Sequence, residues 1–201
     1  MSNSSMKKTR ILTGCGLLTA VAVVLQFIEF PIPIIPSFIK LDFSDLPEII
    51  GAFAYGPVAG IVIALVKNVI HMAVSQSGFV GELSNFVLGA VFSATAGLIY
   101  MHHKTKKTAV IAGIVGAAVM AAVSLPLNYF GIYPLFYNIL GFPQEAVLGM
   151  YQAILPSVKT MPQALIIFNI PFTFVKGLLC VLFTLLIYKP LSPILKGKKA
   201  G

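Results

Sequence analysis

The stretch LDFSDLPEIIGAFAYGP, residues 41–57, decides how many helices this chain forms. It opens an apolar block, residues 46–76, which as a single helix would be about 46 Å long. A membrane hydrocarbon core is only about 30 Å thick. Because Gly56-Pro57 interrupts the block, we expect two helices, a short one over 46–55 and another over 57–76, joined by a tight turn.

The composition excludes an ordinary soluble protein. Hydrophobic residues make up 58% of the 201 residues and charged residues only 10%, against about 45–50% and about 25% in a soluble domain. The length accommodates about five to seven spans of about 20 residues each, with no room for a separate soluble domain. We therefore expect a single membrane domain over residues 1–201.

The basic residues predict the topology. They form clusters at 7–10, 104–107 and 189–199, and the positive-inside rule favours all three on the cytoplasmic side. Five crossings would leave two clusters outside, whereas six satisfy the rule. We thus predict an all-α integral membrane bundle of six transmembrane helices, the second one short, with both termini cytoplasmic. The expected helices are 11–30, 46–55, 57–76, 79–101, 108–130 and 162–188, with outer loops at 31–45 and 131–161.

The first apolar segment, the charged ends and the outer loops lead to three further predictions. The first apolar segment lacks a clear A-x-A cleavage site, so we interpret it as a retained helix and not a signal peptide. The net charge of +8 lies in terminal and loop clusters without base-stacking aromatics, so no nucleic-acid partner is expected. Both outer loops are apolar and rich in proline, and we expect them to pack over a site as a lid.

Polar side chains inside the expected spans map a candidate site, because such groups are costly in lipid. Asn169, Thr173 and Lys176 share one helix face, and Lys67 and His71 share another. One reading is hydrogen bonding between helices, with a lysine paired to Glu82 or Asp45. The other is ligand binding, which we favour for Lys176. The polar residues concerned are Lys67, Asn68, His71, Glu82, Ser84, Asn85, Asn128, Asn169, Thr173 and Lys176.

Three of the six acidic residues lie in the opening stretch. Asp45 and Glu48 have the spacing of a capping box, with Pro47 in the first turn, which indicates helix initiation. Asp42 precedes this cap and is the acid that we assign to loop closure or ligand contact.

Motifs for catalysis and energy supply are missing. The sequence has no zinc-binding pattern, no nucleophile motif and no P-loop, and Cys15 and Cys180 lie in apolar runs as small hydrophobes. No catalytic residue, metal site or cofactor is therefore expected. If the protein transports a substrate, a partner must supply the energy. Gly16 and Ala20 form a small-xxx-small pair that suits either a partner helix or packing within the chain.

Three stretches resemble a known family: LDFSDLPEIIGAFAYGPVAGIVIALVKNVIH (41–71), NYF (128–130) and FNIPFTFVKG (168–177). They are similar to the RibU-type riboflavin-binding S component of bacterial energy-coupling factor (ECF) transporters. The resemblance implies a multi-pass protein of the bacterial cell membrane that captures riboflavin outside and releases it inside. It also implies a transmembrane coupling subunit and two ATPase subunits as partners, with riboflavin as transported substrate and no cofactor.

The resemblance also implies roles for individual residues. Polar ligand contacts fall on Asn128, Asn169, Thr173 and Lys176, and Leu41 and Asp42 of the first outer loop would cover the ligand. The family's coupling surface has an Ala-xxx-Ala pattern, which Gly16 and Ala20 match with a departure in the first position.

Two alternatives from other classes stay open at this point. A membrane-embedded enzyme would use His71, Glu82 and Lys67 around a bound substrate. An ion-coupled carrier would take up a small molecule without ATP.

Overall fold

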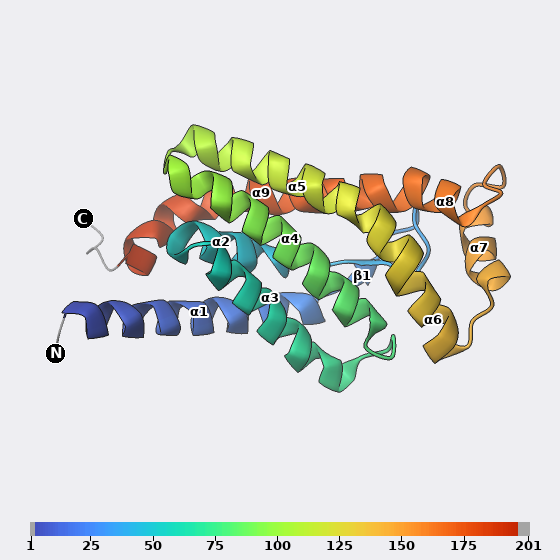
Figure 1. The fold of residues 1–201 in the computed structure, drawn as a ribbon, viewed down its shortest axis with the longest axis horizontal. Coiled ribbons are helices and arrows are strands. Elements are labelled where there is room, and N and C mark those ends of the chain that lie inside the picture. The colour runs from blue at the N-terminus through green and yellow to red at the C-terminus, as the bar shows by residue number, and fades with distance from the viewer. Residues whose placement is uncertain (1–2, 197–201) are drawn as a thin grey trace.

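The computed structural model describes residues 3–196, a bundle of helices with one small hairpin (Figure 1). In this part of the chain, five helical segments are long and apolar enough to cross a membrane: Ser5–Phe27, Pro57–Val74, Val80–His102, Lys106–Leu140 and Met161–Ile187. The prediction of a helical membrane protein is confirmed. Lys198 and Lys199, from the third basic cluster, lie outside the described residues.

The break at residues 56–57 is confirmed. Helix α1 (Asn3–Phe27) is followed by α2 (Asp45–Tyr55) and α3 (Pro57–His71). Gly56 joins the last two with φ 102°, a conformation that glycine adopts without steric cost. Pro57 then occupies the first turn of α3, where a missing N–H breaks no helical hydrogen bond. The helix expected over 57–76 ends at His71, followed by a 3₁₀ turn over Met72–Val74.

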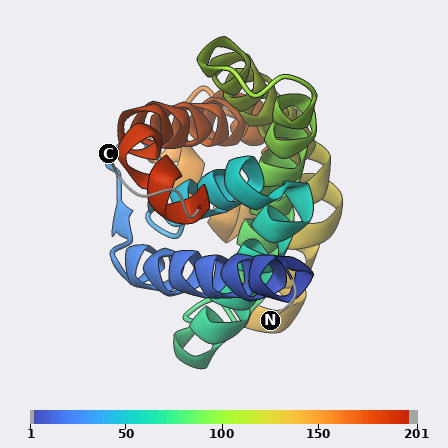
Figure 2. The same ribbon diagram turned by 90° about the vertical axis from the view of Figure 1, so that its left-hand side faces the viewer.

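Helix α2 lies at the centre of the bundle. It contacts α1, α3, α4 (Val80–His102) and α9 (Ile170–Lys196), and Figure 2 shows these helices arranged around it. Its 11 residues span only about 16 Å at about 1.5 Å per residue, too short to cross a hydrocarbon core alone. Most of its side chains are buried, so tertiary contacts hold it in place.

The segment expected as an outer loop, 131–161, contains helices. Helix α5 (Lys106–Leu127) continues into α6 (Tyr133–Leu140), and α7 (Gln144–Gln152) and α8 (Met161–Ala164) follow. The prolines do not prevent this. Pro134 occupies the first turn of α6, where it needs no hydrogen-bond partner, and Pro143 directly precedes α7.

Two π-helical turns interrupt the long helices. One, Asn128–Ile132, connects α5 to α6, and the other, Leu165–Asn169, connects α8 to α9. Each turn carries one of the two asparagines, Asn128 and Asn169, to which the family resemblance assigns ligand contacts. Such wide turns change the direction in which side chains point and are frequent at functional sites.

The expected loop over 31–45 is non-helical, as its three prolines require. Its ends pair as a short antiparallel hairpin, β1 (Phe30–Pro31) with β2 (Lys40–Leu41). The loop therefore returns to the bundle directly before α2.

The start of α1, the α4–α5 connection and the end of α9 lie at one end of the bundle (Figure 1). The last turns of α1 and α3 and the start of α4 lie toward the other end, together with α6, α7 and α8. This second end holds the cavity described next.

Candidate functional site

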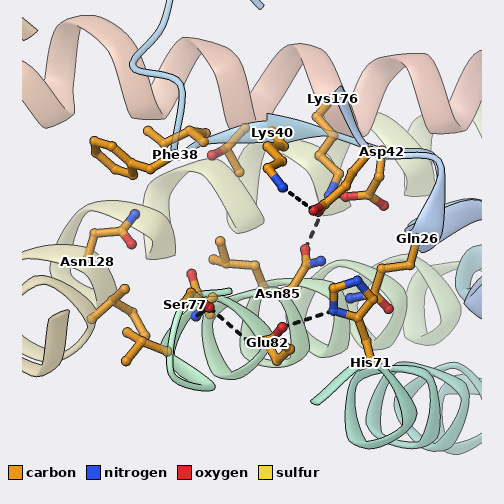
Figure 3. A pocket seen from close by; sticks show the side chains of 18 of the residues that line it. Gln26, Phe38, Lys40, Asp42, His71, Ser77, Glu82, Asn85, Asn128 and Lys176 are labelled. Atoms are coloured by element: carbon orange, nitrogen blue, oxygen red, sulfur yellow. Dashed lines mark hydrogen bonds and ion pairs between the residues drawn. The ribbon is translucent and has the colours of Figure 1, made fainter. Parts of the chain in front are cut away.

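A cavity of about 650 Å³ lies between the helices and under the 31–45 segment (Figure 3). Its walls come from the ends of α1 and α3, the start of α4, the α5–α6 junction and the start of α9. This volume is in the range of pockets that bind small organic ligands.

Four of the residues predicted for ligand contact form one wall of the cavity. Asn128, Asn169, Thr173 and Lys176 all line it and are all buried. The two π turns bring the asparagines there from helices far apart in the sequence. In the described part of the chain, the side chains of Asn128 and Thr173 have no hydrogen-bond partner, so they can serve a ligand.

Asn169 is held by two tyrosines. The Tyr151 hydroxyl donates to Asn169 Oδ1 at 2.7 Å, and Asn169 Nδ2 donates to the Tyr133 hydroxyl at 3.2 Å. Burial and the neighbouring Tyr133 raise the pKa of Tyr151, so Tyr151 stays neutral and remains a donor. The amide of Asn169 is thereby fixed with its remaining hydrogen-bonding capacity toward the cavity.

Lys176 is ion-paired. Its Nζ lies 2.9 Å from Asp42 Oδ2 and 3.1 Å from Asp45 Oδ2, and it donates to Asn85 Oδ1 at 3.2 Å. Burial alone would raise the pKa of Asp42, but the Lys176 and Lys67 charges and a Ser44 hydrogen bond lower it well below its usual range. Asp42 is thus a carboxylate that ties the loop before α2 to α9.

The capping-box interpretation of Asp45 and Glu48 is wrong. Helix α2 does begin with these acids, but its N-terminal cap makes no side-chain hydrogen bond. Instead, Lys67 Nζ lies 2.9 Å from Asp45 Oδ1 and 2.6 Å from Glu48 Oε1. Both carboxylates are buried. Asp45 pairs with Lys67 of α3 and with Lys176 of α9, whereas Glu48 pairs with Lys67.

A second polar wall was not among the predicted ligand contacts. Glu82, at the start of α4, accepts hydrogen bonds from Ser75 Oγ at 2.8 Å and Ser77 Oγ at 3.0 Å. His71 Nδ1 lies 2.9 Å from Glu82 Oε1. Figure 3 shows Glu82, His71 and Ser77 across the cavity from Lys176 and Asp42. The sequence signal was present, because His71 and Glu82 are polar residues within apolar segments.

Gln26 of α1 also lines the cavity. Its Nε2 donates to Asn68 Oδ1 at 2.9 Å, while its Oε1 has no hydrogen-bond partner among the described residues. A buried acceptor of this kind suits a donor on a ligand. The sequence analysis did not predict Gln26 as a site residue, because it is an isolated amide near the end of an apolar helix.

The 31–45 segment closes one side of the cavity. Phe38 lines it and contacts the rings of Tyr133, Phe136 and Tyr151 at centroid distances of 5.7 to 6.3 Å. Lys40 forms an ion pair with Glu29, and both residues line the cavity. The position of this segment matches the lid expected from its apolar composition.

The remaining predicted residues lie elsewhere. Leu41 is buried in β2 and does not line the cavity, whereas its neighbour Asp42 does. Gly16 and Ala20 are both exposed on α1, and a Cβ added to Gly16 would meet no atom within 4 Å. Packing within the described chain therefore does not explain this pair of small residues.

The groups named for an enzyme do not converge. His71 and Glu82 line the cavity, but Lys67 is fully buried behind it in ion pairs. Among residues 3–196, no group of three or more His, Cys, Asp or Glu side chains could hold a metal ion. Cys15 and Cys180 are both free thiols.

A buried cavity with apolar and polar walls inside a membrane-spanning bundle defines a substrate-binding membrane protein. A family model described as "ECF transporter, substrate-specific component" matches residues 10–188. The chain belongs to this family. It is therefore a multi-pass membrane component of a transporter and not an enzyme.

Named relatives and a solved structure agree with this assignment. The Riboflavin transporter RibU of Staphylococcus aureus (strain TCH60) is 35% identical over 192 residues, covering 96% of this chain and 95% of the relative. The Riboflavin transporter FmnP of Bacillus subtilis (strain 168) is 28% identical over 197 residues, covering 96% and 98%. A solved structure described as "Structure and mechanism of the S component of a bacterial ECF transporter" aligns with a TM-score of 0.74 at 35% identity. It covers 94% of this chain and 99% of the other.

Proposed function

We propose that this chain is the riboflavin-binding subunit of an ECF-type vitamin importer. It captures riboflavin outside the cell and releases it inside together with ATPase partners. The observation that carries this proposal is the cavity, in which buried amide, hydroxyl and ammonium groups face an aromatic segment. The two relatives described above, both named riboflavin transporters, support the choice of ligand.

The chemistry of riboflavin suits the cavity. The molecule combines a flat tricyclic ring, which has one polar edge, with a chain of hydroxyl groups. Apolar and aromatic residues such as Phe38 and Phe172 can cover the ring faces, while Asn128, Asn169 and Thr173 offer donors and acceptors. Because each of these polar groups is buried, a ligand that leaves one unpaired loses affinity.

The proposed ligand contacts are Asn128, Asn169, Thr173, Lys176 and Asp42. Lys176 reaches the ligand while ion-paired to Asp42, which keeps a charged side chain tolerable inside the bundle. Leu41 contributes through the hairpin that positions Asp42, since the side chain of Leu41 itself does not line the cavity.

The proposed topology has six transmembrane helices, α2 being the short one, with both termini cytoplasmic and one membrane domain over 1–201. Its support is the placement of the basic residues. The start of α1, whose sequence includes Lys7, Lys8 and Arg10, lies at the same end of the bundle as the α4–α5 connection, whose sequence includes Lys104 (Figure 1). The cavity lies toward the opposite end, so the positive-inside rule orients it toward the outside.

The proposed partners are a transmembrane coupling subunit and two ATPase subunits. The sequence contains no P-loop of its own. The exposed Gly16 and Ala20 on α1 leave a shallow surface on which a partner helix can approach closely.

The direct test is the absorption spectrum of the protein purified from cells grown with riboflavin. We expect a yellow protein that releases free riboflavin on denaturation, and quenching of flavin fluorescence on titration of the ligand-free protein. A colourless preparation that does not quench flavin fluorescence would refute the proposal.

Uptake measurements test whether the ATPase partners are required, and they distinguish the proposed importer from an ion-coupled carrier. Cells that lack the ATPase subunits should not accumulate riboflavin through this protein. If they do, and if uptake into vesicles without ATP follows a sodium or proton gradient, the protein is an ion-coupled carrier.

A further inference from the structure

Glu82 is a charged residue of the cavity that the proposed riboflavin contacts leave without a role, and it is the lining carboxylate that no lysine pairs with among the described residues. It lines the cavity, is buried, and belongs to the wall opposite Lys176 (Figure 3). Two serine hydroxyls and His71 surround its carboxylate. These contacts hold the carboxylate in one orientation.

Among its described lining residues, the cavity has no unpaired lysine or arginine that could bind a phosphate group. Among its described lining residues, four carboxylates face two lysines, namely Glu29, Asp42, Asp45 and Glu82 against Lys40 and Lys176. Lys40 is already paired with Glu29, and Lys176 with Asp42 and Asp45. Even a protonated His71 would leave the carboxylates in excess.

We infer that Glu82 is a specificity-determining residue through which the cavity selects the uncharged flavin over its phosphate monoester. This inference rests on the proposed riboflavin binding. It names the residue that distinguishes riboflavin from flavin mononucleotide, which has the same ring system. A hydroxyl of the uncharged ligand can donate to the Glu82 carboxylate. A phosphate cannot, because it offers only acceptors when ionised.

Binding of the phosphate group in this cavity is energetically unfavourable. At neutral pH a phosphate monoester carries about −1.5 to −2 charges. Inside the cavity it would lose its hydration without gaining a free lysine or arginine, and it would be repelled by Glu82. The wild-type protein should therefore bind flavin mononucleotide at least about tenfold more weakly than riboflavin, a difference of about 1.4 kcal/mol.

The test measures dissociation constants of riboflavin and flavin mononucleotide by fluorescence quenching, with purified full-length protein at pH 7.5 and low salt. Glu82→Gln removes the charge and keeps the shape and one acceptor. We expect the affinity for riboflavin to exceed the affinity for flavin mononucleotide by a factor about fivefold or more smaller than in the wild type, because the repulsion of the phosphate is removed. Glu145→Gln is the matched control, because Glu145 is exposed on α7 outside the cavity, and should leave the ratio of the two affinities unchanged.

A second variant tests the same inference independently, in case Glu82→Gln does not fold. Gln76→Lys places a new cation at an exposed position of the cavity wall and should also narrow the ratio by strengthening binding of flavin mononucleotide. Equal affinity of the wild type for both ligands, or an unchanged ratio in both variants, would overturn the inference. A wild-type protein that binds neither flavin would instead refute the proposed function.

Discussion

The ion pair between Asp42 and Lys176 should contribute strongly to stability, and removing its cation alone should be costly. Asp42 is 3% exposed, and its Oδ2 lies 2.9 Å from Lys176 Nζ. In Lys176→Met, Asp45 keeps Lys67 as partner, whereas Asp42 keeps only hydrogen bonds from Ser44. Breaking a buried pair in this way costs about 3–5 kcal/mol.

Neutralising the carboxylate as well should recover much of this loss. In Asp42→Asn, Lys176 retains Asp45 at 3.1 Å and Asn85 at 3.2 Å, so we expect a cost of only about 1–2 kcal/mol. The double variant removes both charges and should be more stable than Lys176→Met by about 1–3 kcal/mol.

Denaturant unfolding of the ligand-free protein in detergent micelles measures these free energies in a double-mutant cycle. Lys159→Met is the matched control, because Lys159 is exposed, and should change stability by less than about 0.5 kcal/mol. Additive effects of Asp42→Asn and Lys176→Met would show that the pair does not couple and would refute the reasoning.

The pH dependence of the same stability has a definite sign. The pKa of Asp42 is lowered in the folded state, so its contribution is present above the ordinary value of about 3.9 and is lost only as the pH falls through the lower folded value. The stability difference between wild type and Asp42→Asn should therefore be constant between pH 5 and 7. A difference that disappears within this range would contradict the lowered pKa.

Three further changes test the site, the packing and the partner surface. Thr173→Val removes a hydroxyl from the cavity wall and should weaken riboflavin binding about fivefold, the loss of one hydrogen bond; unchanged affinity in a fluorescence titration would remove Thr173 from the contacts. Gly89→Ala would place a Cβ 2.4 Å from Glu48 Oε2 and should cost about 1–3 kcal/mol in the unfolding assay, so wild-type stability would disprove this close approach. A Cβ added at Gly16 meets no atom of the described residues within 4 Å. Gly16→Leu should therefore leave flavin binding intact while ATP-dependent uptake is lost, and Val21→Leu on the same exposed helix is its control. Normal uptake by the Gly16 variant would exclude this surface as the coupling contact.

The break between α2 and α3 could be predicted because its cause is local. Gly56 supplies the positive φ and Pro57 the first helical turn, and neither depends on the rest of the fold. Between residues 131 and 161 the sequence indicated a proline-rich outer loop but not the helices within it. Pro134 lies in a first turn, where a helix tolerates it.

The two π turns could not be predicted from their sequences. Each joins two helical segments and contributes residues to the cavity wall, and a local sequence pattern does not specify its wider hydrogen-bonding pattern. The residue pattern alone identified Asn128 and Asn169 only as polar residues in apolar helices. The family resemblance implied a shared ligand site for them, and both line the same cavity.

By itself, the sequence determined that the chain is a helical membrane protein, where α2 and α3 separate, and which polar side chains need a partner. Composition, backbone breakers and the cost of polar groups in lipid act over short stretches and can be read directly. Only the tertiary structure decided which charges meet. Lys176 and Asp42 are 134 positions apart, and the choice between Asp45 and Glu82 as partner for the lysines depends on how the helices pack. The same packing assigned Glu82 to His71 and placed it in the cavity wall, because a buried charge must find its partner among the groups that the fold brings near it.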